Sequence, residues 1–147
     1  MSALKTTVGV AVLVKNAEGK LLLVKKPDGV GPYAGLYTVP SGGLEAGERI
    51  DDAVRRELYE ETGVTVANLQ HFDFVDDVTE NWRGDLTHFV SLAYTADYVS
   101  GDLRPTEGDD DHLEVIAWFT PEELGQLAIA PHVKQALIKL GYLKESR

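Results

Sequence analysis

The sequence predicts an α/β fold in which a mixed β-sheet lies between α-helices. With 147 residues, 44% of them hydrophobic, the chain is long enough for one core, so we expect a single domain over residues 1–147. Strand-like runs follow one another through hairpins and do not alternate regularly with helices, which favours a mixed sheet. Two longer segments, in the middle of the chain and near its end, have the apolar periodicity of helices.

The first half of the chain predicts two strands, a loop and a short extended segment. Residues 7–14 and 21–25 are rich in β-branched and aliphatic side chains, and the Asn-Ala-Glu-Gly sequence at 16–19 can join them as a hairpin. Residues 27–35 are rich in glycine and proline, which indicates a loop. The extended segment follows at residues 36–39.

The central segment predicts a helix that begins near residue 50. Four apolar residues recur at helical spacing: Ile50, Ala53, Val54 and Leu58. Asp51 and Asp52 lie in the first turn, where the helix dipole favours anions. Gly63 stands where a C-terminal cap belongs, so we expect the helix to end just before it.

The second half of the chain predicts further strands and two helices. The strands are expected at residues 64–66, 71–75, 87–98 and 113–119. Pro121 opens a short helix, and Pro131 stands at the first position of another. That last helix has one apolar stripe, formed by Val133, Leu137 and Leu140.

Composition excludes several classes of protein. The chain has no cysteine, which excludes a disulfide scaffold and a zinc site built on thiolates, and suits a reducing compartment. The longest apolar run, residues 8–14, is too short to cross a bilayer, and the N-terminus does not resemble a signal peptide. We therefore expect a cytoplasmic protein that does not bind membranes.

The net charge of −10, from 24 acidic and 14 basic residues, argues against a nucleic-acid partner. Such a charge repels a phosphate backbone unless basic residues gather on one face, and the sequence has no basic cluster. The surplus carboxylates either keep the protein soluble or, in part, hold divalent cations. Composition does not separate these two readings, but position does.

Several carboxylates of the predicted central helix fall on the side that should face the protein body. At about 100° per residue, Glu57 and Glu61 share an arc with Val54, and Glu60 lies beside them. Like charges in such positions repel one another, and partial burial increases the cost. Arg56 offsets only part of this charge. A hard cation with oxygen ligands, Mg²⁺ or Mn²⁺, would resolve it, and an ordinary salt-bridged helix is the alternative.

The spacing around these glutamates decides between the alternatives. Glu48 follows Gly42 after five residues, and Arg56 follows after seven more. The segment E-L-Y-E-E-T-G-V then runs from Glu57 to Val64. The stretch from Gly42 to Val64 meets every fixed position of G-x5-E-x7-R-E-U-x-E-E-x-G-U, where U is a bulky aliphatic residue. It resembles the Nudix box, and the chain is similar to the MutT-like Nudix hydrolases.

The resemblance implies a Nudix fold and a magnesium site, in which Mn²⁺ can substitute. Glu57 and Glu61 would be the principal metal ligands, and Glu60 would add a ligand directly or through water. Ser41 stands where the family often has a third glycine, and its backbone carbonyl would still be available as a ligand. Each of these donors is an oxygen atom, as magnesium prefers.

The resemblance also implies a reaction, in which water attacks phosphorus in a pyrophosphate linkage. A carboxylate takes the proton from that water, and Glu60, Glu48 and Glu114 are the candidates, with the choice left open. Glu48 could also complete the metal cage, and Glu114 could instead form a salt bridge at the rim. Arg56 would orient the glutamates through charge-assisted hydrogen bonds.

Three residues are candidates for contact with a nucleotide. Tyr33 and Trp82 could stack on a nucleobase, and His132 could touch a base or a phosphate, although a surface histidine without such a role is the plainer interpretation. The substrate would be a small-molecule nucleotide, and a homodimer is left open.

Among nucleotides, the sequence favours nucleoside triphosphates or their oxidised forms. The proline that would indicate ADP-ribose and the tyrosine that would indicate dinucleoside polyphosphates are both missing at the expected distance past the box. Hydrolysis of ADP-ribose or a nucleotide sugar is the alternative. A non-catalytic nucleotide-binding module is a further one, which the complete set of glutamates opposes. An isomerase of the isopentenyl-diphosphate type would need a catalytic cysteine, so it is excluded.

Overall fold

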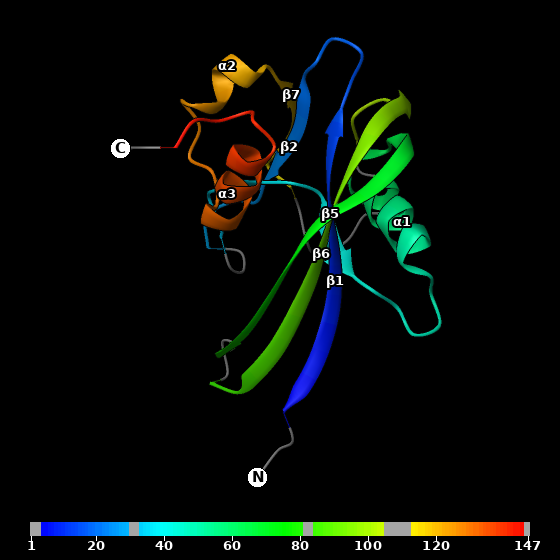
Figure 1. Ribbon diagram of the computed structural model, residues 1–147, viewed down its shortest axis with the longest axis vertical. Coiled ribbons are helices and arrows are strands. Elements are labelled where there is room, and N and C mark those ends of the chain that lie inside the picture. The colour runs from blue at the N-terminus through cyan, green and yellow to red at the C-terminus, as the bar shows by residue number, and fades with distance from the viewer. Residues whose placement is uncertain (1–3, 30–32, 81–83, 105–112, 146–147) are drawn as a thin grey trace.

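The computed structural model describes residues 4–29, 33–80, 84–104 and 113–145, which fold around one mixed sheet. Within these residues the sheet has seven strands: β1 (Lys5–Lys15), β2 (Leu21–Lys25), β3 (Tyr37–Thr38), β4 (Ser41–Gly43), β5 (Thr65–Glu80), β6 (Leu86–Ser100) and β7 (Val115–Phe119). The helices in the same residues are α1 (Ile50–Thr62), α2 (Pro121–Leu124) and α3 (Pro131–Lys139). Helices α1 and α3 pack on opposite faces of the sheet (Figure 1), so the predicted α/β class is confirmed.

The strand order β3-β2-β1-β6-β5 places β1 in the centre of the sheet, parallel to β6 and antiparallel to its other partners. β2 meets β1 beside the hairpin turn, where Lys15 pairs with Leu21. Further back along the same edge of β1, β4 takes over, and Gly42 pairs with Val10. This exchange of partners brings the residues just before α1 to the middle of the sheet.

Alternating side chains of β1 supply both cores. Val10, Val12 and Val14 point into the core beneath α1, where they pack with Val54 and Leu58. Leu13 points the other way, into a core with α3 that contains Leu21, Leu23, Val133 and Leu137. Successive side chains of a strand point to opposite faces of the sheet, so one apolar run contributes to both cores.

Helix α1 has the bounds and the termination that the sequence predicts. It ends at Thr62, and Gly63 follows in the left-handed conformation with φ 75°, donating its N–H to the Tyr59 carbonyl. The Thr62 hydroxyl, although buried, donates to the Leu58 carbonyl at 2.7 Å. The helix is held on the sheet through Ala53, Val54 and Leu58, each no more than 1% exposed.

Two predicted elements differ in the structure. The strands expected at 64–66 and 71–75 are parts of the single strand β5, because bulges absorb the polar segment between them. Asn68 adopts φ 57°, and the register with β6 shifts between Ala67 and Gln70 and again between His71 and Asp73. Ser41–Gly43, expected to form a loop, is the short strand β4. The two C-terminal helices are confirmed.

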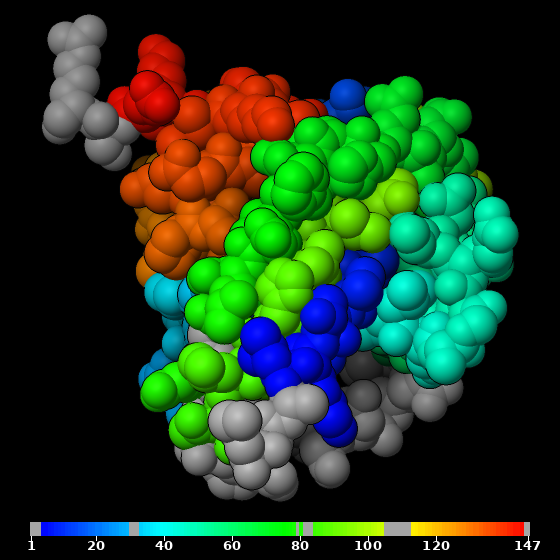
Figure 2. Space-filling view, turned by 60° about the horizontal axis from the view of Figure 1, so that its bottom comes forward, coloured from blue at the N-terminus to red at the C-terminus, as the bar shows by residue number. Residues whose placement is uncertain are grey.

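The N-terminal ends of β1 and β6 and the C-terminal end of β5 extend beyond α1 and α3, towards the bottom of Figure 1. In Figure 2, β5 lies on the surface in green, beside β6 in yellow-green and β1 in blue. No helix in the described residues is long and apolar enough to cross a membrane.

Candidate active site

The guanidinium group of Arg56 is the centre of the candidate site. Its Nε and Nη2 atoms donate to the two oxygens of Glu48 at 2.7 and 2.9 Å. Its Nη1 atom donates to Glu57 at 2.9 Å and to Glu60 at 3.3 Å. Nη2 also donates to the carbonyl of Gly43 at 3.0 Å. One side chain of α1 thereby ties the preceding loop and two helix carboxylates together.

Glu48 connects the segment between β4 and α1 to Arg56. It accepts both arms of the Arg56 fork and, in addition, the N–H of Glu45 at 3.1 Å. Its side chain is only 15% exposed. The hydrogen bonds from Arg56 lower the pKa of the Glu48 carboxyl, which stays ionised as a result. In return, Glu48 is the main reason why the pKa of Arg56 is raised.

Glu57 is the carboxylate in the least favourable surroundings. Its side chain is 18% exposed, and burial raises its pKa although the bond from Arg56 opposes this. The neighbouring charges of Glu60 and Glu48 raise it further. The carboxylate lies directly against Gly42, in the place that a Cβ atom at that position would occupy. The absence of a side chain at Gly42 therefore makes room for Glu57.

Glu61 connects α1 to strand β4. Its Oε1 atom accepts the backbone N–H of Ser41 at 2.9 Å. The structure therefore brings these two predicted ligand residues together, but through the N–H of Ser41 and not its carbonyl. The spacing along the sequence gives no signal for this contact, because it depends on how β4 pairs with β1.

The donor set fits a hard divalent cation in its chemistry. Glu57, Glu60 and Glu61 offer carboxylate oxygens from one end of α1, and Ser41 adds backbone groups. In the described residues, however, no three acidic or histidine side chains surround a common point closely enough to hold a metal. Glu57 and Glu60 instead converge on Arg56.

Glu114 lies at the start of β7 in an ion pair with Lys25. The Lys25 Nζ atom is 3.2 Å from Glu114, and the Glu114 N–H donates to the Lys25 carbonyl at 2.7 Å. The hydrogen bond that Lys25 donates to the Glu114 carboxylate is the main reason that the pKa of Lys25 is raised. The salt bridge predicted as one alternative for Glu114 is present, and its role as a base or ligand stays a prediction. Sequence reasoning missed Lys25, whose only signal is its place at the end of a strand.

The three predicted nucleotide contacts have different outcomes. Tyr33 and His132 lie together, with ring centroids 4.7 Å apart and planes tilted by 49°. His132 belongs to α3, on the other face of the sheet from α1, and neither ring is brought into the Arg56 network. Burial lowers the pKa of His132. Trp82 lies outside the described residues.

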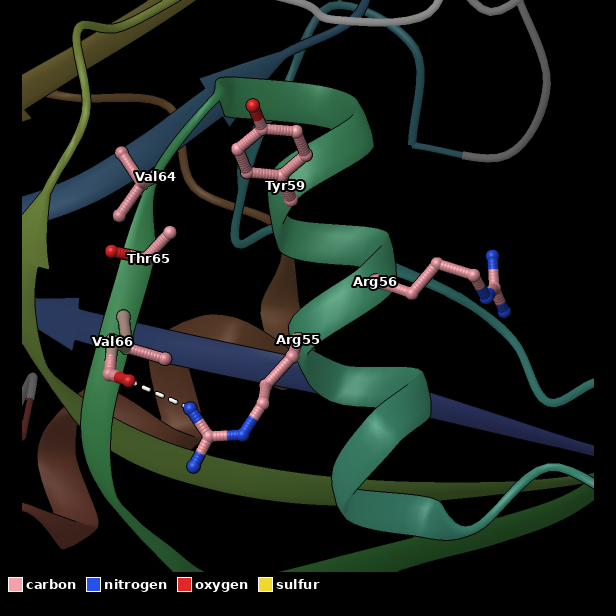
Figure 3. A pocket seen from close by; sticks show the side chains of 6 residues that line it. All are labelled: Arg55, Arg56, Tyr59, Val64, Thr65 and Val66. Atoms are coloured by element: carbon pink, nitrogen blue, oxygen red, sulfur yellow. Dashed lines mark hydrogen bonds between the residues drawn. The ribbon is translucent and has the colours of Figure 1, made fainter.

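A hollow of about 370 Å³ lies on the other side of α1, between the helix and the start of β5 (Figure 3). Arg55 crosses it and donates to the Val66 carbonyl at 2.7 Å, and Tyr59 lines its other end, near Val64. Arg56 also lines the hollow, but in Figure 3 its guanidinium group points away from Arg55 and Val66. The hollow therefore shares Arg56 with the candidate active site, but none of the glutamates that Arg56 binds lines it.

Fold and site together define a class: an α/β domain whose central helix gathers glutamates around one arginine, next to the glycines of strand β4. The NUDIX domain family matches residues 5–140. The chain belongs to the Nudix hydrolase family.

Two relatives are the NAD-capped RNA hydrolases NudC of Vibrio parahaemolyticus, 34% identical over 128 residues, and of Pseudomonas aeruginosa, 34% identical over 135 residues. These matches cover 87% and 92% of this chain but 44% of each relative, so the chain spans less than half their length. Among solved structures, a MutT NUDIX hydrolase from Burkholderia pseudomallei superposes with a TM-score of 0.72 at 29% identity, over 90% of this chain and 95% of that one.

The contact between Gly42 and Glu57 leads to a prediction with a matched control. Gly42→Ala should lower turnover by about tenfold or more, because the new methyl group displaces the carboxylate and misplaced groups are costly in catalysis. Gly43→Ala should leave turnover near wild type, since nothing lies within 4 Å of a Cβ at that position. Steady-state kinetics of the two variants make the comparison. Equal rates for both would contradict a role for Glu57 in this position.

Proposed function

We propose that this protein is a magnesium-dependent pyrophosphohydrolase that cleaves a nucleotide-type substrate by attack of water at phosphorus. The observation that carries the proposal is the set of glutamates at one end of α1, which lie around Arg56 and, in the case of Glu57, against Gly42 of strand β4. Carboxylates that share a partly buried site with one arginine are poorly compensated, and a divalent cation would compensate them. Membership of the Nudix family supports the same activity.

Glu57 and Glu61 would hold the cation, together with the backbone carbonyl of Ser41, and Glu60 would contact it through a bound water, from which it could take a proton. When bound, a divalent cation neutralises the diphosphate and lowers the pKa of water. Mn²⁺ would serve in place of Mg²⁺, since both accept carboxylate oxygens. Arg56 would keep the glutamates in place through the hydrogen bonds described above.

Glu60 is the candidate that we favour for the general base. Among the hydrogen bonds that Arg56 donates to Glu48, Glu57 and Glu60, the one to Glu60 is the longest, at 3.3 Å. The Glu60 side chain is 35% exposed. Glu48 is the weaker candidate because Arg56 lowers its pKa, and a low pKa makes a poor proton acceptor. Glu114, 51% exposed and paired with Lys25, would have to leave its partner first.

Activity should therefore require added Mg²⁺ or Mn²⁺ and be lost in excess chelator. Hydrolysis in ¹⁸O-labelled water should place the label on a phosphorus-bound oxygen of a phosphate product, which mass spectrometry of the products detects. Label on a sugar carbon would contradict attack at phosphorus. Full activity in EDTA, with Mg²⁺ without effect, would contradict the metal site.

For the substrate, we propose a nucleoside triphosphate or an oxidised nucleotide first, as the sequence favours. A second candidate is an NAD-type dinucleotide, because both relatives described above are named NAD-capped RNA hydrolases. The net charge of −10 favours a small molecule over an RNA chain. ADP-ribose and nucleotide sugars are further candidates. Tyr33 and His132 are proposed base contacts on the strength of their paired rings.

A nucleotide panel separates these candidates. Triphosphates, NAD, ADP-ribose and a nucleotide sugar are compared at equal concentration with Mg²⁺, and kcat/KM ranks them. Release of pyrophosphate identifies a triphosphate substrate, whereas two phosphomonoesters identify a dinucleotide. Binding without turnover across the panel would favour the non-catalytic module. A cytoplasmic location, a homodimer and a single domain over residues 1–147 stay predictions.

A further inference from the structure

The second half of β5 is an exposed strand at the edge of the sheet. β5 is the last strand in the sheet order, beside β6. Phe74, Val75 and Val78 are exposed by 58%, 46% and 49%. A long edge strand with apolar side chains is a template on which another chain can pair. The same segment is also acidic, through Asp73, Asp76, Asp77 and Glu80.

Two backbone N–H groups of this segment are bound by neighbouring carboxylates. The N–H of Phe74 donates to the Asp73 side chain at 2.8 Å, and the N–H of Val78 donates to the Asp77 side chain at 2.9 Å. Phe74 and Val78 are four residues apart, so their N–H groups point to the same edge of the strand. A donor that a carboxylate already holds is not available to a neighbouring strand.

The beginning of β5 is protected by other means. Arg55 donates to the Val66 carbonyl from α1, which occupies an edge acceptor with a side chain (Figure 3). The bulges that follow, around Asn68 and at His71, interrupt the regular edge. Asp73 is additionally bound to Lys139 of α3 at 3.0 Å, so its carboxylate is anchored. The first part of the β5 edge is therefore protected by Arg55 and the bulges. The second part is protected by aspartates.

The spacing of the two donors is compatible with pairing to a second copy of this chain. A two-fold antiparallel pair that used both donors would place Phe74 opposite Val78 of a second copy, and Val78 opposite its Phe74. Apolar pairs of this kind stabilise a sheet. The same register places Asp76 opposite Asp76, where like charges repel. The apolar residues therefore favour self-pairing, and the aspartates oppose it.

We propose that residues 73–80 of β5 form an edge that can pair with a second copy of this chain. Asp73, Asp76 and Asp77 prevent this pairing in the wild-type protein. Asp73 and Asp77 act by holding backbone donors, and Asp76 acts by charge. The proposal is independent of the catalytic one, because none of these residues belongs to the Arg56 network. A homodimer of the wild-type chain would accordingly use another surface.

The test is the molecular mass in solution of variants in which the aspartates become threonine, a residue that strands tolerate well. We expect Asp73→Thr with Asp76→Thr and Asp77→Thr to raise the mass from that of the 16.1 kDa chain towards twice that value. Self-association should strengthen by about tenfold or more. The double variant Asp76→Thr with Asp77→Thr keeps the bond from Asp73 to Lys139 and leaves the Phe74 N–H bound to Asp73, so it should associate more strongly than wild type but more weakly than the triple variant. Light scattering after gel filtration provides the mass.

A matched control removes three exposed acids elsewhere, by Glu18→Gln, Glu122→Gln and Glu145→Gln, and should keep the wild-type mass. Adding Val78→Pro to the triple variant deletes one edge donor and should reverse the association. Hydrolase activity reports folding, since it should be retained in every variant. If wild type already dimerises through another face, the triple variant should form a larger assembly. Equal masses for the double variant, the triple variant and wild type would overturn the proposal, as would association that survives Val78→Pro.

Discussion

Replacing Glu57 by glutamine should reduce turnover about a thousandfold, which corresponds to about 4 kcal/mol of lost transition-state stabilisation. The change keeps the size of the side chain and removes its charge. Glu57 packs against Gly42 and accepts a hydrogen bond from Arg56, so its carboxylate has a defined place in the candidate site. Single-turnover and steady-state kinetics over a range of Mg²⁺ concentrations measure the loss.

The same variant should be at least as stable as wild type when metal is absent. Burial raises the pKa of Glu57, which means that the folded state disfavours its charge. Glutamine removes this cost, while metal should no longer raise the melting temperature as it does in wild type. Thermal melts in EDTA and in Mg²⁺ compare the two proteins. Glu122→Gln, at an exposed position of α2 outside the Arg56 network, serves as the control and should behave as wild type.

A turnover within tenfold of wild type for Glu57→Gln would contradict its role as a metal ligand. The activity would then have to be explained by the remaining carboxylates. A large loss of stability in EDTA would instead show that the Glu57 carboxylate is mainly a partner for Arg56. These two outcomes are separable, because the first is read from kinetics and the second from melting without metal.

Replacing Arg56 by alanine should cost about 2 kcal/mol of stability, or about 5 °C in melting temperature. The guanidinium group is 23% exposed and bonds to three glutamates and one carbonyl, so its removal leaves partly buried carboxylates without compensation. Arg56→Lys should recover only part of the loss, because an ammonium group cannot bind both oxygens of Glu48 as the fork does. Chemical denaturation measures both variants.

The effect of Arg56→Ala should depend on pH in a defined direction. Arg56 lowers the pKa of Glu48, so their interaction stabilises the fold when the pH is above the ordinary pKa of glutamate, and this contribution is lost as the pH falls. The difference between wild type and Arg56→Ala should therefore narrow on acidification. Arg49→Ala is the control, because that exposed residue makes no side-chain cap at the start of α1. A variant as stable as wild type at neutral pH would contradict the central role of Arg56.

The sequence alone was sufficient for the elements that depend on local patterns. The bounds of α1 follow from apolar residues at helical spacing and from Gly63, which can adopt the left-handed conformation that ends a helix. The strands of β1 and β6 follow from runs of β-branched side chains. The family followed from the fixed spacing between Gly42 and Val64. Each of these signals is contained in a window of fewer than about 25 residues, where neighbours in sequence are neighbours in space.

Only the tertiary structure decided which partners the candidate residues have. Ser41 meets Glu61 because β4 joins the edge of β1 that β2 leaves, and Glu114 meets Lys25 because β7 pairs with β2. These contacts join separate elements of the fold, and no local propensity specifies them. The tertiary structure also decided that β5 is one continuous strand and not two, since it pairs with β6 on both sides of its bulges. Strand pairing is set by the whole core, which is why it is decided only when the chain has folded.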